Sequence, residues 1–225
     1  MSFDLALFVS SCNVPEPEEF LRRCDEFFQL LSEANSQFNL TRLDSRQDYD
    51  IKHVADSLAI VRECPELISD PERQLCIADV GCGAGFPSVI LASAFPFFRI
   101  SAIDSTGKKA AFVASAAEKL QLTNLTVING RANELARKAE YKHRFDIVTA
   151  RAVAAAPKLR KEAAGFLKRK SGCFYLYQTP AQSERELPLM NDDRDYQWHV
   201  TPAFELPESA GSRGFLIGRP ISLPR

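Results

Sequence analysis

The stretch that most restricts the possible folds is "IADVGCGAGFPSVILA", residues 77–92, where an apolar run meets three glycines within five residues. A proline and a second apolar run follow the glycines. The pattern predicts a buried strand, a tight turn and the start of a helix. In open α/β sheets, such a turn lies at the carboxyl edge of the strand, where ligands bind. The loop is therefore a fold signal and a candidate site.

Short apolar runs alternate with helical patterns after residue 71, which predicts βαβ units, a parallel sheet and right-handed crossovers. The predicted strands cover 75–80, 98–104, 125–130, 144–150 and 172–178. Between them, helices are predicted over 87–94, 108–120, 132–139 and 156–168. Two final apolar runs, 196–206 and 214–223, have no helical pattern between them. We expect this pair to close the sheet in antiparallel fashion.

The first 70 residues have a different character and predict a small helical lobe. Helical spacing occurs near 3–11, over 17–36 and over 51–64, where Pro65 ends the pattern. Residues 1–50 hold ten acidic and four basic residues, a charge of −6, against +5 for residues 51–225. We therefore expect a helical lobe with its connector over 1–70 and an α/β domain over 71–225. The mildly basic body is compatible with a phosphate-rich partner.

Cysteines, histidines and hydropathy exclude several classes of protein. The six cysteines are widely spaced without a C-x-x-C pair, and the chain has three histidines, so we expect neither a zinc site nor a disulfide framework. Reduced thiols of this kind are typical of a cytoplasmic protein. No apolar run approaches the length of a membrane span, and the N-terminal segment lacks the basic region of a signal peptide.

The glycine loop can be compared with three kinds of cofactor site. A P-loop needs a lysine after its last glycine, but Phe86-Pro87 follows Gly85. A dinucleotide loop needs a third glycine at position 86, and this chain has Phe86 there, which disfavours a dinucleotide. An adenosine cofactor without phosphates fits better, because Asp104 ends the second strand, where an acid typically accepts ribose hydroxyls. Asp79 at the end of the first strand can hold the loop or meet a cation.

Several motifs in order give the chain a family resemblance over about residues 35–180: "FNLTRL", "KHVADSL", "IADVGCGAGFPSV", "AIDSTGKKAAFV", "GRANEL" and "FDIVTARAVA". The chain resembles the glucose-inhibited division protein B family, also known as ribosomal RNA small subunit methyltransferase G. The resemblance implies a seven-stranded, Rossmann-like S-adenosylmethionine-dependent methyltransferase sheet. It also implies an enzyme that methylates N7 of a guanosine in the decoding-region loop of bacterial 16S rRNA. Its partner would be 16S rRNA or the small ribosomal subunit, and no membrane, metal or oligomer is implied.

The resemblance also carries over individual site residues. It implies a cofactor site that contains Gly81, Gly83, Phe86, Asp104, Ala132, Asn133 and Arg151. Arg151 is the candidate positioning residue, and no catalytic residue is assigned. Candidates for holding the RNA are Asn39, Arg42, His53, Asp56, Ser57, Lys108 and Lys109. Each could also have a purely structural role.

Two positions depart from the family pattern. Many relatives have an acid where this chain has Asn133, and a lysine where it has Gln178 in "YLYQTP". An amide cannot replace a cation that grips phosphate. The run "KLRKEAAGFLKRK" is the best basic patch for rRNA, although it could equally be a solvated helix face.

The chemistry expected of such an enzyme is simple. N7 of guanine has a lone pair and no proton, so methyl transfer needs alignment and exclusion of water but no general base. Cys82 is expected to pack against the strand end and not to act as a nucleophile. Two other functions stay open from the sequence: a non-catalytic rRNA-binding or ribosome-assembly factor that keeps the fold, and a small-molecule methyltransferase.

Overall fold

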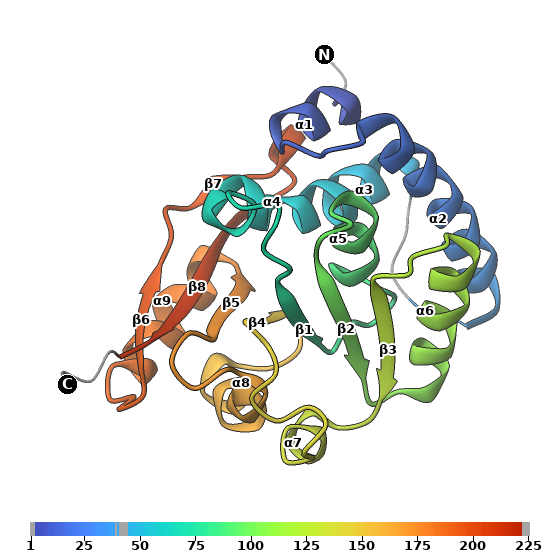
Figure 1. Cartoon of the computed structure of the whole chain (residues 1–225). Coiled ribbons are helices and arrows are strands. Elements are labelled where there is room, and N and C mark those ends of the chain that lie inside the picture. Colours follow the sequence, from blue (N-terminus) through green and yellow to red (C-terminus); the bar gives the residue numbers. More distant parts are fainter. Residues whose placement is uncertain (1–2, 39, 41–44, 222–225) are drawn as a thin grey trace.

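The computed structural model describes residues 3–38, 40 and 45–221, and its centre is a single mixed sheet with helices on both faces (Figure 1). The strands are β1 (Cys76–Val80), β2 (Arg99–Asp104), β3 (Leu125–Asn129), β4 (Ile147–Arg151), β5 (Cys173–Gln178), β6 (Tyr196–Val200), β7 (Phe204–Glu205) and β8 (Ser212–Pro220). Their order is β3-β2-β1-β4-β5-β8-β6, and the two-residue β7 pairs with β8 outside this path. The expected seven-stranded sheet is therefore confirmed.

The first five strands run parallel, and β8 lies antiparallel between β5 and β6. This confirms the predicted closure by an antiparallel pair. The strand order reverses between β1 and β4, since β1 leads through β2 to β3 on one side and β4 to β5 on the other. Open sheets form a crevice at such a reversal, outside the carboxyl ends of the strands.

The helices that precede and interleave with the strands cover the first face of the sheet. They are α1 (Leu5–Ser11), α2 (Pro17–Phe38), α3 (Arg46–Tyr49), the π-helix η1 (Asp50–Ala55), α4 (Asp56–Glu63), α5 (Ser88–Ala94) and α6 (Gly107–Lys119), with a short 3-10 turn η2 (Pro65–Leu67). Helix α2 lies against α5 and α6, and α4 also contacts α5 (Figure 1). Their apolar side chains form one buried core with the strands.

The second face of the sheet is covered by α7 (Ala132–Leu135), α8 (Ala156–Ala163), η3 (Ala164–Phe166) and the 3-10 helix η4 (Leu187–Met190). Alternate residues of each strand contribute to the two cores, as in β5, where Phe174 and Leu176 face the second core and Tyr175 and Tyr177 the first. This is the period of two expected for a strand. No described helix is both long enough and apolar enough to cross a bilayer.

Several helix predictions need correction. The helix predicted over 156–168 ends at Ala163, because the carbonyls of Gly165 and Phe166 accept bonds from the amides of His143 and Phe145 and not from a continuing helix. The link after β5 contains an additional helix, α9 (Pro180–Glu186). Its signal was present in the sequence as a capping box, in which the side chains of Thr179 and Gln182 each accept from the other's amide.

The helix predicted over 51–64 begins earlier and is not uniform, since α3, η1 and α4 run on from Arg46 to Glu63 with a π-turn at Asp50–Ala55. A short 3-10 helix, η5 (Pro207–Ser209), joins β7 to β8. The boundary expected at residue 70 stays a prediction.

Candidate functional site

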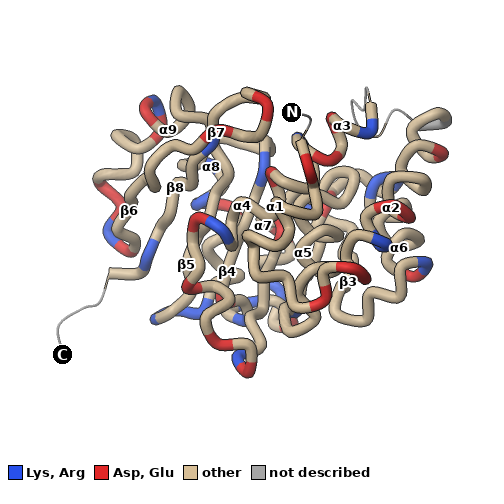
Figure 2. Tube along the Cα trace, turned by 90° about the horizontal axis from the view of Figure 1, so that it is seen from above, with Lys and Arg blue, Asp and Glu red and all other residues tan. Residues whose placement is uncertain are grey.

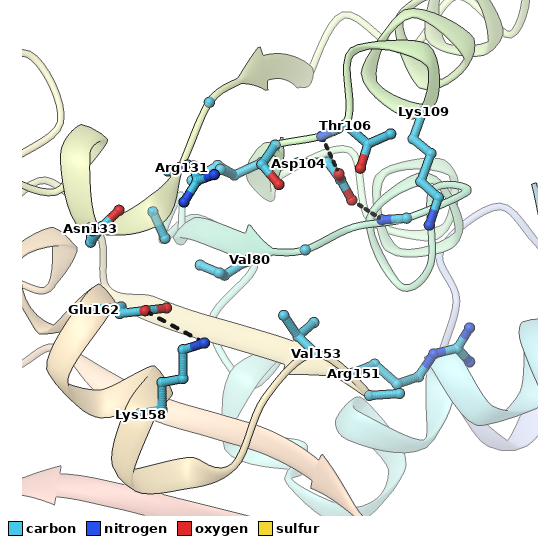
Figure 3. Close-up of a pocket in the computed structure, with 17 residues that line it drawn as sticks. Val80, Asp104, Thr106, Lys109, Arg131, Asn133, Arg151, Val153, Lys158 and Glu162 are labelled. Atoms are coloured by element: carbon cyan, nitrogen blue, oxygen red, sulfur yellow. Dashed lines mark hydrogen bonds and ion pairs between the residues drawn. The ribbon is translucent and has the colours of Figure 1, made fainter.

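A cavity of about 550 Å³ opens at the reversal point, outside the carboxyl ends of β1, β2 and β4 (Figure 3). Its lining includes seven residues expected from the sequence: Gly81, Gly83, Asp104, Lys109, Ala132, Asn133 and Arg151. The first four come from the loop after β1 and from β2 and α6, and the others from α7 and β4. Because parallel strands end at the same edge of a sheet, residues far apart in the chain meet here.

The glycine loop uses its glycines for two different purposes. Gly81 and Gly83 both have positive φ, +72° and +57°, a conformation that side chains other than glycine rarely adopt. A Cβ on Gly81 would lie 2.5 Å from Cγ2 of Val153, so this glycine lets the loop after β4 pack on the loop after β1. A Cβ on Gly83 would meet only the carbonyl of Gly81, at 4.0 Å. Open space beside the loop backbone is therefore found at Gly83 and not at Gly81.

Asp104 holds the shape of the glycine loop from the end of β2. Its Oδ2 accepts the amide of Gly83 at 2.9 Å, and its Oδ1 accepts the amide of Thr106 at 2.7 Å (Figure 3). A carboxylate can accept about four hydrogen bonds, so these two contacts leave capacity for a ligand. The carboxylate is thus both a support for the loop and an acceptor in the cavity wall.

Phe86 lies behind the cavity and does not line it. Its ring is buried, with His53 stacked on it at a centroid distance of 4.3 Å and the Arg151 guanidinium 5.4 Å from the ring centroid. Phe27 of α2 also packs on it, with ring centroids 5.4 Å apart. The aromatic residue that replaces the third glycine of a dinucleotide loop therefore joins the loop to α2 and to the π-helix.

Arg151 lies at the rim, and its guanidinium points away from the cavity toward the π-helix (Figure 3). It donates to Asp56 Oδ2 at 2.9 Å and to the carbonyl of Lys52 at 3.0 Å, and its Nη2 lies 3.2 Å from His53 Nδ1. The other oxygen of Asp56 lies 3.2 Å from Nε of Arg213 on β8. The "KHVADSL" segment therefore meets the end of β4 through this cluster.

Asp79, the last acid before the loop, is buried beneath the cavity. Burial raises its pKa to about 7, and the hydrogen bond from Ser88 and the charge of Arg151 offset only part of this effect. Among the described residues, no donor reaches its Oδ1. The carboxyl is thus partly protonated near neutral pH.

The wall opposite Asp104 was not found from the sequence. Lys158 and Glu162 of α8 line the cavity one helical turn apart, with Nζ 4.0 Å from Oε1 (Figure 3). Arg131 lies on the other side of the cavity, beside Ala132 and Asn133. The i, i+4 spacing of Lys158 and Glu162 was readable, but it indicates only a solvated helix face.

The remaining RNA-binding candidates lie elsewhere. Lys108 borders a groove between α2 and α6, whereas its neighbour Lys109 lines the cavity. Ser57 is fully buried, and its carbonyl accepts a bond from the Tyr177 hydroxyl at 2.8 Å. Asn39 and Arg42 lie outside the described residues.

The basic side chains of residues 158–170 lie in different parts of the structure. Arg160 pairs with Asp193 and Asp195, and Lys168 pairs with Asp146 near the start of β4. Of the basic residues in this run, only Lys158 lines the cavity. Basic and acidic residues are interspersed along the chain trace, for example on α2 (Figure 2). The run therefore does not form a single basic face.

Gln178 also has an internal role. Its side chain is buried, with Nε2 donating to Glu186 at 2.9 Å and Oε1 accepting from Ser183 at 3.0 Å. Position 178 is thus part of a buried polar network between β5 and α9.

Comparison with known proteins agrees with this architecture. A family model described as rRNA small subunit methyltransferase G matches residues 21–206. A ribosomal RNA small subunit methyltransferase G from Leuconostoc citreum is 34% identical over 183 residues, 80% of this chain and 74% of the relative. A second relative of the same description, from Staphylococcus aureus, is 33% identical over 221 residues, which cover 95% of this chain and 87% of the relative. The crystal structure of an O-methyltransferase from Bacillus cereus in complex with SAH has a TM-score of 0.59 at 15% identity, covering 89% of this chain and 91% of that one, which is a likeness of fold.

Proposed function

The chain belongs to the rRNA small subunit methyltransferase G family, and from this membership we propose that it transfers a methyl group from S-adenosylmethionine to N7 of a guanosine in 16S rRNA. The observation that carries the proposal is the family match over residues 21–206, which includes every segment that lines the cavity. We place the reaction in the cytoplasm, on naked 16S rRNA or on the small ribosomal subunit.

The residues of the cavity fit an adenosine cofactor that carries no phosphate. The volume of about 550 Å³ lies within the range of ligand pockets. Asp104 offers acceptors for ribose hydroxyls, and Asn133 offers an amide that can both donate and accept. The space above Gly83, which a Cβ would fill, allows the backbone to approach a ligand. Two carboxylates, Asp104 and Glu162, suit the positive charge of a sulfonium group.

S-adenosylmethionine, when bound, supplies an electrophilic methyl group whose bond to sulfur breaks as the N7 lone pair forms the new carbon–nitrogen bond. No proton leaves guanine at this step, so the protein needs no general base. The contribution of this chain is to fix the position of the reacting groups and to keep water away, which can lower a barrier by roughly 7–11 kcal/mol.

Two residues would do most of this positioning. Asp104 would hold the ribose and at the same time fixes the loop through the amides of Gly83 and Thr106. Arg151 fixes the end of β4 through Asp56. Both act through contacts already formed in the protein, so little reorganisation is needed when the ligands bind.

Cys82 has no covalent role in the proposed reaction. Its thiol is buried, and burial raises its pKa well above the ordinary value, so it stays protonated at neutral pH. A protonated thiol is a poor nucleophile. None of the six cysteines forms a disulfide.

The rim of the cavity supports an approach by RNA. Lys109, Arg131 and Lys158 surround the opening, and cations there attract the phosphate backbone. The experiment that tests the proposal is primer extension after borohydride–aniline cleavage of rRNA from a deletion strain and from the same strain complemented with this chain. We expect a cleavage stop at one 16S guanosine only in the complemented strain. A stop that persists in the deletion strain would contradict the proposal.

A further inference from the structure

A second cavity, of about 360 Å³, lies beside the cofactor cavity at the carboxyl ends of β4 and β5, next to α9. Ala152 and Val153 line both cavities. The loop between β4 and α8 therefore borders both cavities. The volume of the second cavity is that of a small ligand pocket.

The shared wall is held in a defined conformation. Ala152 has a φ of +56°, in the left-handed region that alanine rarely adopts. Val153, which follows it, packs over Gly81 but keeps 46% of its surface exposed. Strained backbone of this kind persists only where surrounding contacts fix it, and it is concentrated at functional sites.

A buried carboxylate lies in the lining of the second cavity. Glu186 of α9 is 4% exposed, and its Oε2 accepts from the amide of Ala156 at 2.7 Å and from Gln178 Nε2 at 2.9 Å. Its Oε1 lies 3.4 Å from Nη2 of Arg185. Because a carboxylate can accept about four bonds, Glu186 has capacity for a ligand that carries N–H donors. The rest of the lining includes apolar side chains, among them Leu159 and Leu176.

We propose that the second cavity receives the target guanine, with Glu186 accepting from its N1–H and N2–H groups. This inference rests on the proposed function. Enzymes that modify a base commonly take it out of its stack into a pocket, where it is read by hydrogen bonds to its Watson–Crick edge. N7 lies on a different edge of the purine from N1 and N2, so a guanine held by Glu186 can turn N7 toward the shared wall and the cofactor cavity.

The arrangement also selects against other bases. Adenine has a lone pair at N1 where guanine has a hydrogen, so the Glu186 carboxylate would face an acceptor. A buried polar group that loses its partner weakens binding strongly, which gives discrimination that shape alone cannot provide. Gln178 is neutral, so its hydrogen bond does not cancel the charge of Glu186, and Arg185 lies 3.4 Å from the other oxygen.

The test compares guanosine with inosine, which lacks the N2 amino group, at the target position of rRNA assembled into small ribosomal subunits. Transfer of a tritiated methyl group gives kcat/KM for the wild type, for Glu186→Gln and for Glu184→Gln. Glu184 is an exposed acid on the same helix, so its variant is a control for the lost charge. Calorimetry with S-adenosylmethionine checks that each variant keeps its cofactor site.

We expect the wild type and Glu184→Gln to prefer guanosine over inosine by about tenfold to a hundredfold, the effect of one hydrogen bond to a charged group. In Glu186→Gln this preference should shrink at least threefold, with cofactor affinity unchanged. If Glu186 were only structural, both substrates would lose activity equally, and an unchanged preference would overturn the inference. A wild type that methylates neither RNA, whether assembled into subunits or naked, would overturn the proposed function as well.

Discussion

Arg151, at the end of β4, donates from Nη1 to Oδ2 of Asp56, at the start of α4, across 2.9 Å. Asp56 is almost fully buried, and its second oxygen faces Nε of Arg213 on β8 at 3.2 Å. One carboxylate thus joins three segments that are far apart in the chain. The sequence placed Asp56 among the RNA-binding candidates, and the structure places it beneath the rim of the cavity, where it positions Arg151.

The first prediction concerns the energy of this contact. Asp56→Asn should lower the free energy of unfolding by about 2–3 kcal/mol, because it leaves two arginines without their charged partner. The measurement is urea denaturation of the wild type, Asp56→Asn, Arg151→Ala and the double variant. The loss of unfolding free energy in the double variant should differ from the sum of the two single losses by about 1 kcal/mol or more. Additive effects would show that the pair is not coupled.

The second prediction separates the two glycines of the loop. Gly81→Ala should destabilise the protein by about 3 kcal/mol, because the new Cβ meets Val153 and the backbone is left-handed. Gly83→Ala should lower the free energy of unfolding by about 1 kcal/mol, because alanine is strained in the left-handed backbone conformation. It should also weaken cofactor binding. Thermal unfolding and calorimetry with S-adenosylmethionine measure the two effects.

Val153→Ala provides the control for this pair. In the Gly81→Ala background it removes the clashing methyl groups and should recover part of the lost stability. It should have no such effect on Gly83→Ala, whose Cβ meets no side chain. Equal rescue of both variants would rule out the contact as the cause.

The third prediction concerns the pH dependence of stability. The Asp79 carboxyl has an ordinary pKa of 3.8 in an unfolded chain, and burial raises its pKa to about 7 in the folded protein. Between these pH values the folded state binds the additional proton, so its stability falls as pH rises from 4 to 7. The full effect is about 4 kcal/mol for a shift of this size.

Asp79→Asn tests this effect, because an amide resembles the protonated carboxyl and does not titrate. We expect the free energy of unfolding to decline less steeply between pH 4 and 7 in the variant than in the wild type. The difference between the two profiles isolates Asp79 from the other titrating groups. Parallel profiles would mean that Asp79 is ionised in the folded protein throughout this range.

The fourth prediction compares two acids of the cofactor cavity. Asp104→Asn should weaken S-adenosylmethionine binding at least tenfold and should also lower stability by about 1–3 kcal/mol, because the new NH₂ group would face a backbone amide. Glu162→Gln makes the same change of charge at the opposite wall. Its exposed pair with Lys158 should change stability by less than about 1 kcal/mol. A similar loss of stability in both variants would contradict the support role of Asp104.

Local patterns were sufficient for most of the fold. The alternation of apolar runs with helical spacing predicted the five parallel strands and the antiparallel end of the sheet. The missed helix α9 had a local signal too, the capping box of Thr179 and Gln182. No comparable local signal marks the early end of α8. The backbone leaves the helix there because it forms hydrogen bonds with residues 143–145.

The sequence by itself determined that the glycine loop and Asp104 would share one site, because parallel strands bring their carboxyl ends to one edge. Only the tertiary structure decided that Val153 fills the space over Gly81, that Phe86 lies in the core and that Arg151 turns toward Asp56. These are contacts between side chains far apart in the chain. Periodicity fixes which face of an element is buried, but it does not fix which distant side chain lies against it.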